Sequence, residues 1–297
     1  MIRLKTHLGE AAILLAAVLW GCISLFSRNM TARGFTPTQM VAVRAIFTAL
    51  ILAIILLIKD PKLFRVRPRD LWMFLGSGIC SFLFFNVCYM NSLVENSVSV
   101  ACILMYTSPF WVLFLSVPIF KEKFTAKRAV SLVIAFAGCV FVSLSPTLIL
   151  TKLGLVFGLL SGFGYALYSI FGKLAAKHYH TMTITFYTFL FAVCGVLPLC
   201  DPPALLSLMT TPENALWSLG IAVFETVLPY MLYTYGLSKT SAGKAAVLCI
   251  AEPVVAALIG TLVFSEYLGP LGILGIVLVA IGLGILEQQP QKNKRRR

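Results

Sequence analysis

Three ionisable side chains lie inside long apolar stretches of the sequence: Arg44, Glu225 and Glu252. Each is separated from the nearer end of its stretch by about 8–11 residues, or roughly 12–16 Å of helix. Ionisable groups at that depth are costly in lipid and usually mark a substrate or ion pathway. One arginine and two glutamates leave one carboxyl in excess, which could exchange a proton or hold a substrate ammonium. The alternative is a structural ion pair between Arg44 and one glutamate.

Glu252 is the strongest of these candidates, because Pro253 follows it directly. Proline lacks a backbone donor and frees a carbonyl nearby, so a carboxyl and an unpaired backbone group would share one site. Aromatic and polar side chains of the same stretches could complete a cavity: Trp20, Tyr89, Tyr106, Tyr165, Tyr168, Tyr230 and Tyr233, with Asn86 and Ser108. The alternatives for these residues are interfacial aromatic belts and packing contacts between helices.

The cysteines and histidines predict neither a metal site nor a cofactor. None of the eight cysteines forms a Cys-x-x-Cys pair, and all lie in or beside apolar stretches, as small buried hydrophobic residues do. His178 and His180 share a basic loop without further ligands, so a metal centre is not expected there.

The composition is that of an all-α integral membrane protein. Hydrophobic residues make up 59% of the 297 residues and charged residues 12%, and the mean hydropathy is +0.93. A bilayer core about 30 Å thick needs about 20 apolar residues per helix. Apolar length and Pro, Gly and charged punctuation predict ten transmembrane helices, at residues 8–27, 36–58, 71–93, 97–120, 128–145, 153–172, 182–200, 214–237, 242–264 and 270–286.

The basic residues predict the orientation of these spans. With ten spans, 20 of the 24 lysines and arginines fall on the side that holds both termini. Lysine and arginine collect on the cytoplasmic side, so both termini are expected in the cytoplasm of a multi-pass cell-membrane protein. The basic tail, residues 289–297, fits a contact with anionic lipid, and nucleic acid is not an expected partner.

The sequence contains an internal repeat. An offset of 144 or 145 residues aligns Trp20 with Tyr165, Arg28 with Lys173, Leu93 with Leu237, Ser97 with Ser241, Pro109 with Pro253 and Glu122 with Glu266. The predicted domains are two repeats, residues 1–146 and 147–288. Each repeat holds five spans, an odd number, so the two must cross the membrane in opposite senses. Inverted repeats are the basis of alternating access in carriers, which favours a transporter.

The chain resembles the EamA-type transporters of the drug/metabolite transporter superfamily. The resemblance rests on Trp20-Gly21 to Arg28, Arg44, Pro109 followed by Lys121-Glu122-Lys123, and Ala251-Glu252-Pro253-Val254 followed by Glu266. It implies a ten-helix inverted-repeat carrier, with a cavity lined by the first, third and fourth helices of each half. The first repeat departs from the pattern, with Ser108-Pro109 where the family often has Glu-Pro.

We therefore expect a secondary transporter rather than an enzyme. Its cargo would be a small amino acid-like or other amphipathic metabolite, exported on family grounds and possibly coupled to protons. The sequence holds no phosphate-binding glycine loop that would indicate direct use of ATP. An integral-membrane enzyme and a channel are the alternatives. Membrane lipid and the small-molecule substrate are the expected partners, with the chain a monomer or a homodimer.

Overall fold

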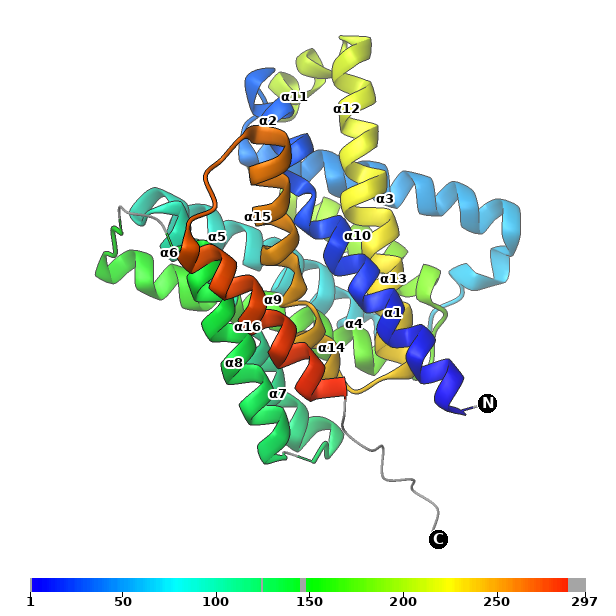
Figure 1. Cartoon of the computed structure of the whole chain (residues 1–297). Coiled ribbons are helices and arrows are strands. Elements are labelled where there is room, and N and C mark those ends of the chain that lie inside the picture. Colours follow the sequence, from blue (N-terminus) through cyan, green and yellow to red (C-terminus); the bar gives the residue numbers. More distant parts are fainter. Residues whose placement is uncertain (1, 124, 145–147, 288–297) are drawn as a thin grey trace, which may run out of the picture.

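The computed structural model describes residues 2–123, 125–144 and 148–287, and these are almost entirely helical (Figure 1). Helices of the first half are α1 (Ile2–Gly21), α2 (Ile23–Ala32), α3 (Pro37–Lys59), α4 (Leu71–Leu75), α5 (Phe84–Glu95), α6 (Val98–Met105), α7 (Ser108–Phe120) and α8 (Ala126–Ser143). Those of the second half are α9 (Lys152–Ala175), α10 (Thr181–Val196), α11 (Pro202–Met209), α12 (Pro212–Ala222), α13 (Leu228–Lys239), α14 (Ala242–Leu248), α15 (Ala251–Phe264) and α16 (Pro270–Glu287).

Nine helical stretches of this described chain are long and apolar enough to cross a membrane. They correspond to the first nine predicted spans, with ends shifted by a few residues. The tenth predicted span is an apolar helix too, but a shorter one, over Pro270–Leu286. Helix α11 was not predicted, because its eight residues are far too few to register as a span. The basic tail at 289–297 lies outside the described residues.

Five predicted spans are irregular inside. Two contain a stretch of π-helix: η3 (Gly76–Leu83) between α4 and α5, and η5 (Val223–Val227) between α12 and α13. Three others break into a pair of helices: α1 with α2, α6 with α7, and α14 with α15. In the last two, proline lies within the first turn of the helix that follows the break, where its missing N–H costs nothing. Such irregular backbone tends to accompany function in membrane helices.

The two halves of the chain interleave. Helix α1 packs along α13 and α15 of the second half, α3 along α10 and α12, and α5 along α9. The pair α8 and α16, side by side in Figure 1, approaches closely at Gly138: a Cβ added there would lie 2.6 Å from the Gly275 carbonyl oxygen. Because helices of the first half pack directly on helices of the second half, a cavity at the centre is lined by residues of both halves.

The two ends of the bundle carry different polar contacts. At one, the Glu122 end, Lys244 Nζ lies 2.6 Å from Glu10 Oε1, and the Glu122 carboxylate binds the start of α14. At the other, the Glu266 end, Arg28 pairs with Glu266. The first contacts are largely buried and the last is half exposed.

Candidate functional site

A cavity of about 220 Å³ lies among helices of both halves. It is close to the lower limit of small-molecule sites, which measure roughly 300–1,000 Å³. Its walls are mostly aromatic and apolar, with one carboxylate and one guanidinium. The lining residues are Trp20, Ile23, Arg44, Phe85, Asn86, Tyr89, Cys102, Met105, Tyr106, Tyr165, Tyr230, Glu252 and Ala256. The structure thus brings together eight of the twelve candidate residues named from the sequence, Tyr230 among them.

Glu252 supplies the negative charge of the cavity. It is the second residue of α15, directly after the break that separates this helix from α14, so its side chain leaves the helix at the level of the break. The Tyr165 hydroxyl donates to Glu252 Oε2 over 3.2 Å. The residue is partly exposed, and it lines the cavity.

Arg44 supplies the positive charge, and its contacts are to uncharged groups. Its Nε donates to Thr226 Oγ1 over 3.0 Å and its Nη2 to the backbone carbonyl of Glu225 over 3.3 Å. The guanidinium also lies 5.7 Å from the ring centre of Phe82. Among the described residues, the ion pairs within 4.0 Å do not include Arg44, so the structural pair with Glu225 or Glu252 is not formed here.

Glu225 lies apart from the cavity. It sits in the π-helical stretch η5 with no solvent exposure, and neither carboxylate oxygen has a hydrogen-bond partner among the described residues. The π-helix places its backbone carbonyl, rather than its carboxyl, against Arg44. A buried carboxyl without partners is a costly feature that a purely structural role does not explain.

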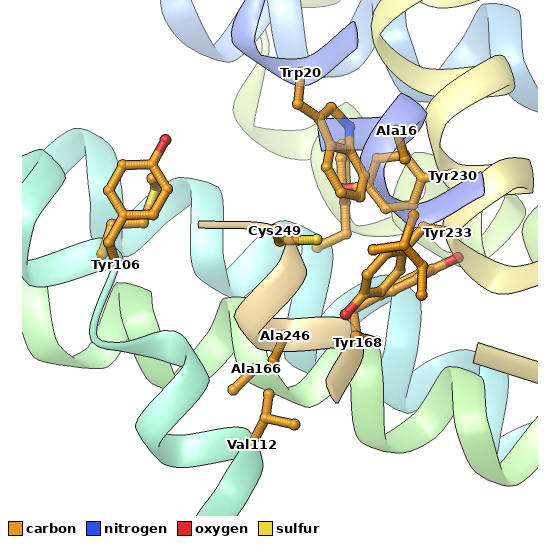
Figure 2. Close-up of a cluster of buried hydrophobic side chains, with 14 of the residues drawn as sticks. Ala16, Trp20, Tyr106, Val112, Ala166, Tyr168, Tyr230, Tyr233, Ala246 and Cys249 are labelled. Atoms are coloured by element: carbon orange, nitrogen blue, oxygen red, sulfur yellow. The ribbon is translucent and has the colours of Figure 1, made fainter. Parts of the chain in front are cut away.

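Aromatic rings close the cavity on one side. Trp20 packs edge-on against Tyr230, with ring centres 5.2 Å apart, and lies 5.4 Å from Tyr233 (Figure 2). Tyr168 and Tyr233 do not line the cavity. They lie behind Trp20 and Tyr230, where Tyr168 shares a 2.7 Å hydrogen bond with Thr234. These two predicted site residues therefore support the wall rather than form it.

Tyr89, Tyr106 and Asn86 line the opposite part of the cavity, as predicted positions that the fold brings to it. The Tyr89 hydroxyl lies 3.0 Å from Cys102 Sγ. Asn86 donates its amide to the Phe82 carbonyl over 2.7 Å, so its own side-chain oxygen is left to accept. In Figure 2, Tyr106 lies at the left and Trp20 at the top, with Cys249 drawn between them.

Ser108 is a further predicted residue that does not line the cavity; it is buried as the first residue of α7. Sequence reasoning missed the apolar lining residues Ile23, Phe85, Cys102, Met105 and Ala256. Helical spacing could have found both cysteine and methionine: Cys102 lies four residues before Tyr106, and Met105 lies three residues after Cys102. Cys102 was instead interpreted as a small core residue.

Two other features of the described residues lack the free groups that a binding site needs. Within the described ranges, His, Cys, Asp and Glu side chains form no group of three that could hold a metal ion. A larger, shallower hollow of about 630 Å³ lies between Gly34 and Leu208. Its Thr36 and Asp201 side chains already cap helices, so it offers few free groups to a ligand.

The fold and the cavity are those of a polytopic membrane protein whose internal site contains one basic residue, Arg44, and one acidic residue, Glu252. The EamA-like transporter family matches the chain twice, over residues 7–144 and 152–287, and the chain belongs to this family. The double match establishes a two-repeat architecture.

Several relatives have transporter names. An uncharacterized transporter of Archaeoglobus fulgidus is 29% identical and covers 93% of this chain and 94% of its own. The uncharacterized transporter YwfM of Bacillus subtilis is 24% identical, over 98% and 97%. The uncharacterized inner membrane transporter YhbE of Escherichia coli is 23% identical, over 90% and 83%. One crystal structure superposes with a TM-score of 0.78 at 15% identity, covering 93% and 95% of the two chains, which supports the fold alone. The protein is a multi-pass membrane transporter.

Proposed function

We propose that this transporter is a secondary carrier that exports a small amphipathic metabolite across the cytoplasmic membrane by alternating access. The observation that carries the proposal is the central cavity, in which Glu252 and Arg44 face a common space walled by aromatic rings. A carrier needs an enclosed site of this kind near the midplane, where both repeats contribute side chains.

The proposed topology has ten spans in two inverted repeats, residues 1–146 and 147–288. The apolar segment of α16 is short, but 17–18 residues at 1.5 Å per residue reach roughly 26 Å, close to the bilayer core. Five spans in each repeat reverse the orientation of the second. The lysine and arginine distribution then favours the Glu122 end, with both termini, as the cytoplasmic end.

The proposed cargo carries an ammonium group, as an amino acid or another amphipathic amine does. Glu252 would receive the ammonium, and the rings of Trp20, Tyr106 and Tyr230 would add cation–π attraction. Arg44 keeps one nitrogen, Nη1, without a hydrogen bond among its described contacts, and this nitrogen is available to an acceptor on the cargo. The aromatic walls suit an apolar body between the two polar ends.

Proton coupling is the proposed energy source, and Glu225 is its candidate carrier. A buried carboxyl without partners can exist with a bound proton and become charged only when its surroundings rearrange. Arg44, whose Nη2 donates to the backbone carbonyl of Glu225, is a charged group beside it. Glu225→Gln should retain exchange of cargo between the two sides and lose accumulation driven by a pH gradient. Unchanged accumulation in that variant would remove Glu225 from the coupling step.

The test of the function is counterflow in proteoliposomes. Thermal stabilisation of the purified protein by amino acids, polyamines, nucleobases and sugars would first identify a ligand, because a ligand of the native state raises the melting temperature. Vesicles loaded with unlabelled ligand should then accumulate labelled ligand transiently and with saturation. Uptake that never exceeds equilibrium would indicate a channel, and conversion of the ligand would indicate an enzyme.

A further inference from the structure

Two glutamates occupy the same local structure in the two repeats. Lys121 ends α7 and Ser265 ends α15, both in the left-handed conformation, with φ of 52° and 55°. The next backbone N–H, of Glu122 and of Glu266, reaches back to the carbonyl of Ser116 and of Gly260 respectively. All three pairs of positions are 144 residues apart. The backbone therefore presents the two carboxylates in equivalent ways.

The two carboxylates nevertheless make different contacts. Glu122 reaches into the other repeat, where it accepts from the backbone N–H of Ala242 over 2.8 Å and of Gly243 over 3.3 Å. Arg128 Nη1 lies 3.6 Å from Glu122 Oε2, the oxygen that also accepts from Gly243, and only 10% of the Glu122 side chain is exposed. Glu266 pairs with Arg28, and 52% of its side chain is exposed.

The positions equivalent to Ala242 and Gly243 are Val98 and Ser99, the first residues of α6. Within the described residues no side chain caps this helix, since Ser97 instead bonds through its hydroxyl to the Ile149 N–H. The helix start that Glu266 would cap by symmetry is thus left open.

The basic partners show the same difference. Lys173 donates to the backbone carbonyls of Leu237 and Thr240 at the end of α13, which holds the Glu122 end together. Its repeat counterpart is Arg28, and the counterparts of the two carbonyls belong to Leu93 and Asn96 at the end of α5. Arg28 does not reach them here, because it is paired with Glu266.

We propose that Glu122 and Glu266 are the residues that set which end of the transporter is closed, by capping α14 and α6 in alternation. This inference rests on the proposed alternating access, because inverted repeats provide two nearly equivalent packings. In the opposite state Glu266 accepts from the N–H groups of Val98 and Ser99, Arg28 binds the carbonyls of Leu93 and Asn96, and Glu122 leaves α14. The described state is closed at the Glu122 end.

We call the contacts of Glu122 with α14 the Glu122 lock, and the contacts of Glu266 with α6 in the opposite state the Glu266 lock. The two locks are unequal in strength. The Glu122 lock includes Arg128, whose Nη2 also donates to Ser241 Oγ over 3.2 Å, while the equivalent position in the second repeat is Gly272. Lys244 adds its pair with Glu10, and its equivalent is Val100. With more charged contacts at one end, the empty protein rests with the Glu122 end closed and the Glu266 end open.

Hydrogen–deuterium exchange on the purified full chain reads these N–H groups directly. In the wild type, residues 242–243 should be protected and residues 98–99 should exchange fast. Glu122→Gln should speed exchange at 242–243 by about tenfold and slow it at 98–99, because loss of one lock populates the state held by the other. Glu266→Gln, the matched variant, should do the reverse and protect 242–243 further.

If Glu122→Gln changes the exchange rate at residues 242–243 alone, Glu122 is only a local helix cap and the proposal is overturned. Exchange rates that shift in the same direction in both variants would also overturn it. If Glu122→Gln is not monodisperse, Glu122→Asp withdraws the carboxylate by one methylene and is scored in the same way. Counterflow of the wild type is measured in parallel. Its absence refutes the carrier function, whereas reciprocal exchange still establishes the two locks.

Discussion

The break between α6 and α7 and the break between α14 and α15 have the same backbone arrangement but carry different side chains before the proline, Ser108 and Glu252. Each interrupts a membrane span just before a proline. The backbone is nearly the same at the two breaks: φ and ψ are −71° and 5° at Tyr106, and −65° and −7° at Ile250, the position that aligns with it. Ser108 and Glu252 each stand directly before the proline, and they differ in side-chain length and charge. Glu252 faces the cavity and Ser108 does not.

The repeat therefore preserves the backbone, while the side chains that it gives to the cavity differ between the two halves. The first repeat gives the cavity Trp20, Arg44 and most of its apolar wall, and the second gives it the carboxylate. If that division is correct, the charge cannot be moved between the equivalent positions of the two repeats.

Moving the carboxylate is expected to abolish transport. The double variant Ser108→Glu with Glu252→Ser keeps the overall charge but places the carboxyl on the buried side of α7. We expect counterflow to fall about a hundredfold, because a charged hydrogen bond contributes about 1.5–3 kcal/mol and each 1.4 kcal/mol is tenfold. Recovery of transport to the wild-type rate would show that the two positions are interchangeable.

Arg44→Ala removes the first repeat's charge and is expected to weaken both binding and stability. The Thr226 hydroxyl and the Glu225 carbonyl would lose their donor in a buried setting, at a cost of about 1–3 kcal/mol each at most. Thermal unfolding and counterflow measured on the same preparation separate the two effects. Arg44→Lys keeps a charge without the planar fork and should be intermediate; equality with the wild type would deny Arg44 its bonding role.

Tyr165→Phe should raise the KM for the cargo about threefold to tenfold, because Glu252 loses the hydroxyl that orients its carboxylate. Tyr168→Phe is the matched control: it also loses a hydroxyl bond, to Thr234, but behind the cavity wall. The control should lower the melting temperature and leave the KM unchanged. A KM effect of equal size in both variants would mean that any lost hydroxyl bond in the cavity wall weakens binding, and that the bond to Glu252 has no special role.

Glu266→Gln should have the smallest effect on stability. Its pair with Arg28 is half exposed, and exposed ion pairs contribute about 0–1 kcal/mol. Glu122→Gln should cost more, because that carboxylate is 10% exposed and accepts two backbone hydrogen bonds. Chemical unfolding in detergent compares them. A larger loss in Glu266→Gln would invert the assignment of the closed end.

Much of the fold could be predicted from sequence, because the thickness of the bilayer fixes the length of an apolar span, and charged residues mark where spans end. The helix at α3 was placed within one residue at each end, since Thr36 and Pro37 mark its start and Lys59 its end. The breaks inside the spans were not predicted. Pro253 indicated a disturbance near Glu252, but not that the chain leaves the helix at Cys249 and Ile250.

The candidate site was predicted in part, for a related reason. Charges in a span are conspicuous, so Arg44 and Glu252 were found, while Glu225 was grouped with them although the π-helix turns its carboxyl away from the cavity. Tyr168 and Tyr233 share the helices that line the site but face its supporting layer. Direction around a helix depends on local irregularity, and composition does not reveal it.

The most direct test of the account is counterflow by Glu252→Gln beside Ser108→Ala, with the stabilising ligand as cargo. Both variants change the same aligned position, one in each repeat. We predict that Glu252→Gln loses saturable counterflow and ligand stabilisation together, while Ser108→Ala stays within about twofold of the wild type. Normal counterflow in correctly folded Glu252→Gln would contradict the claim that this carboxylate binds the cargo.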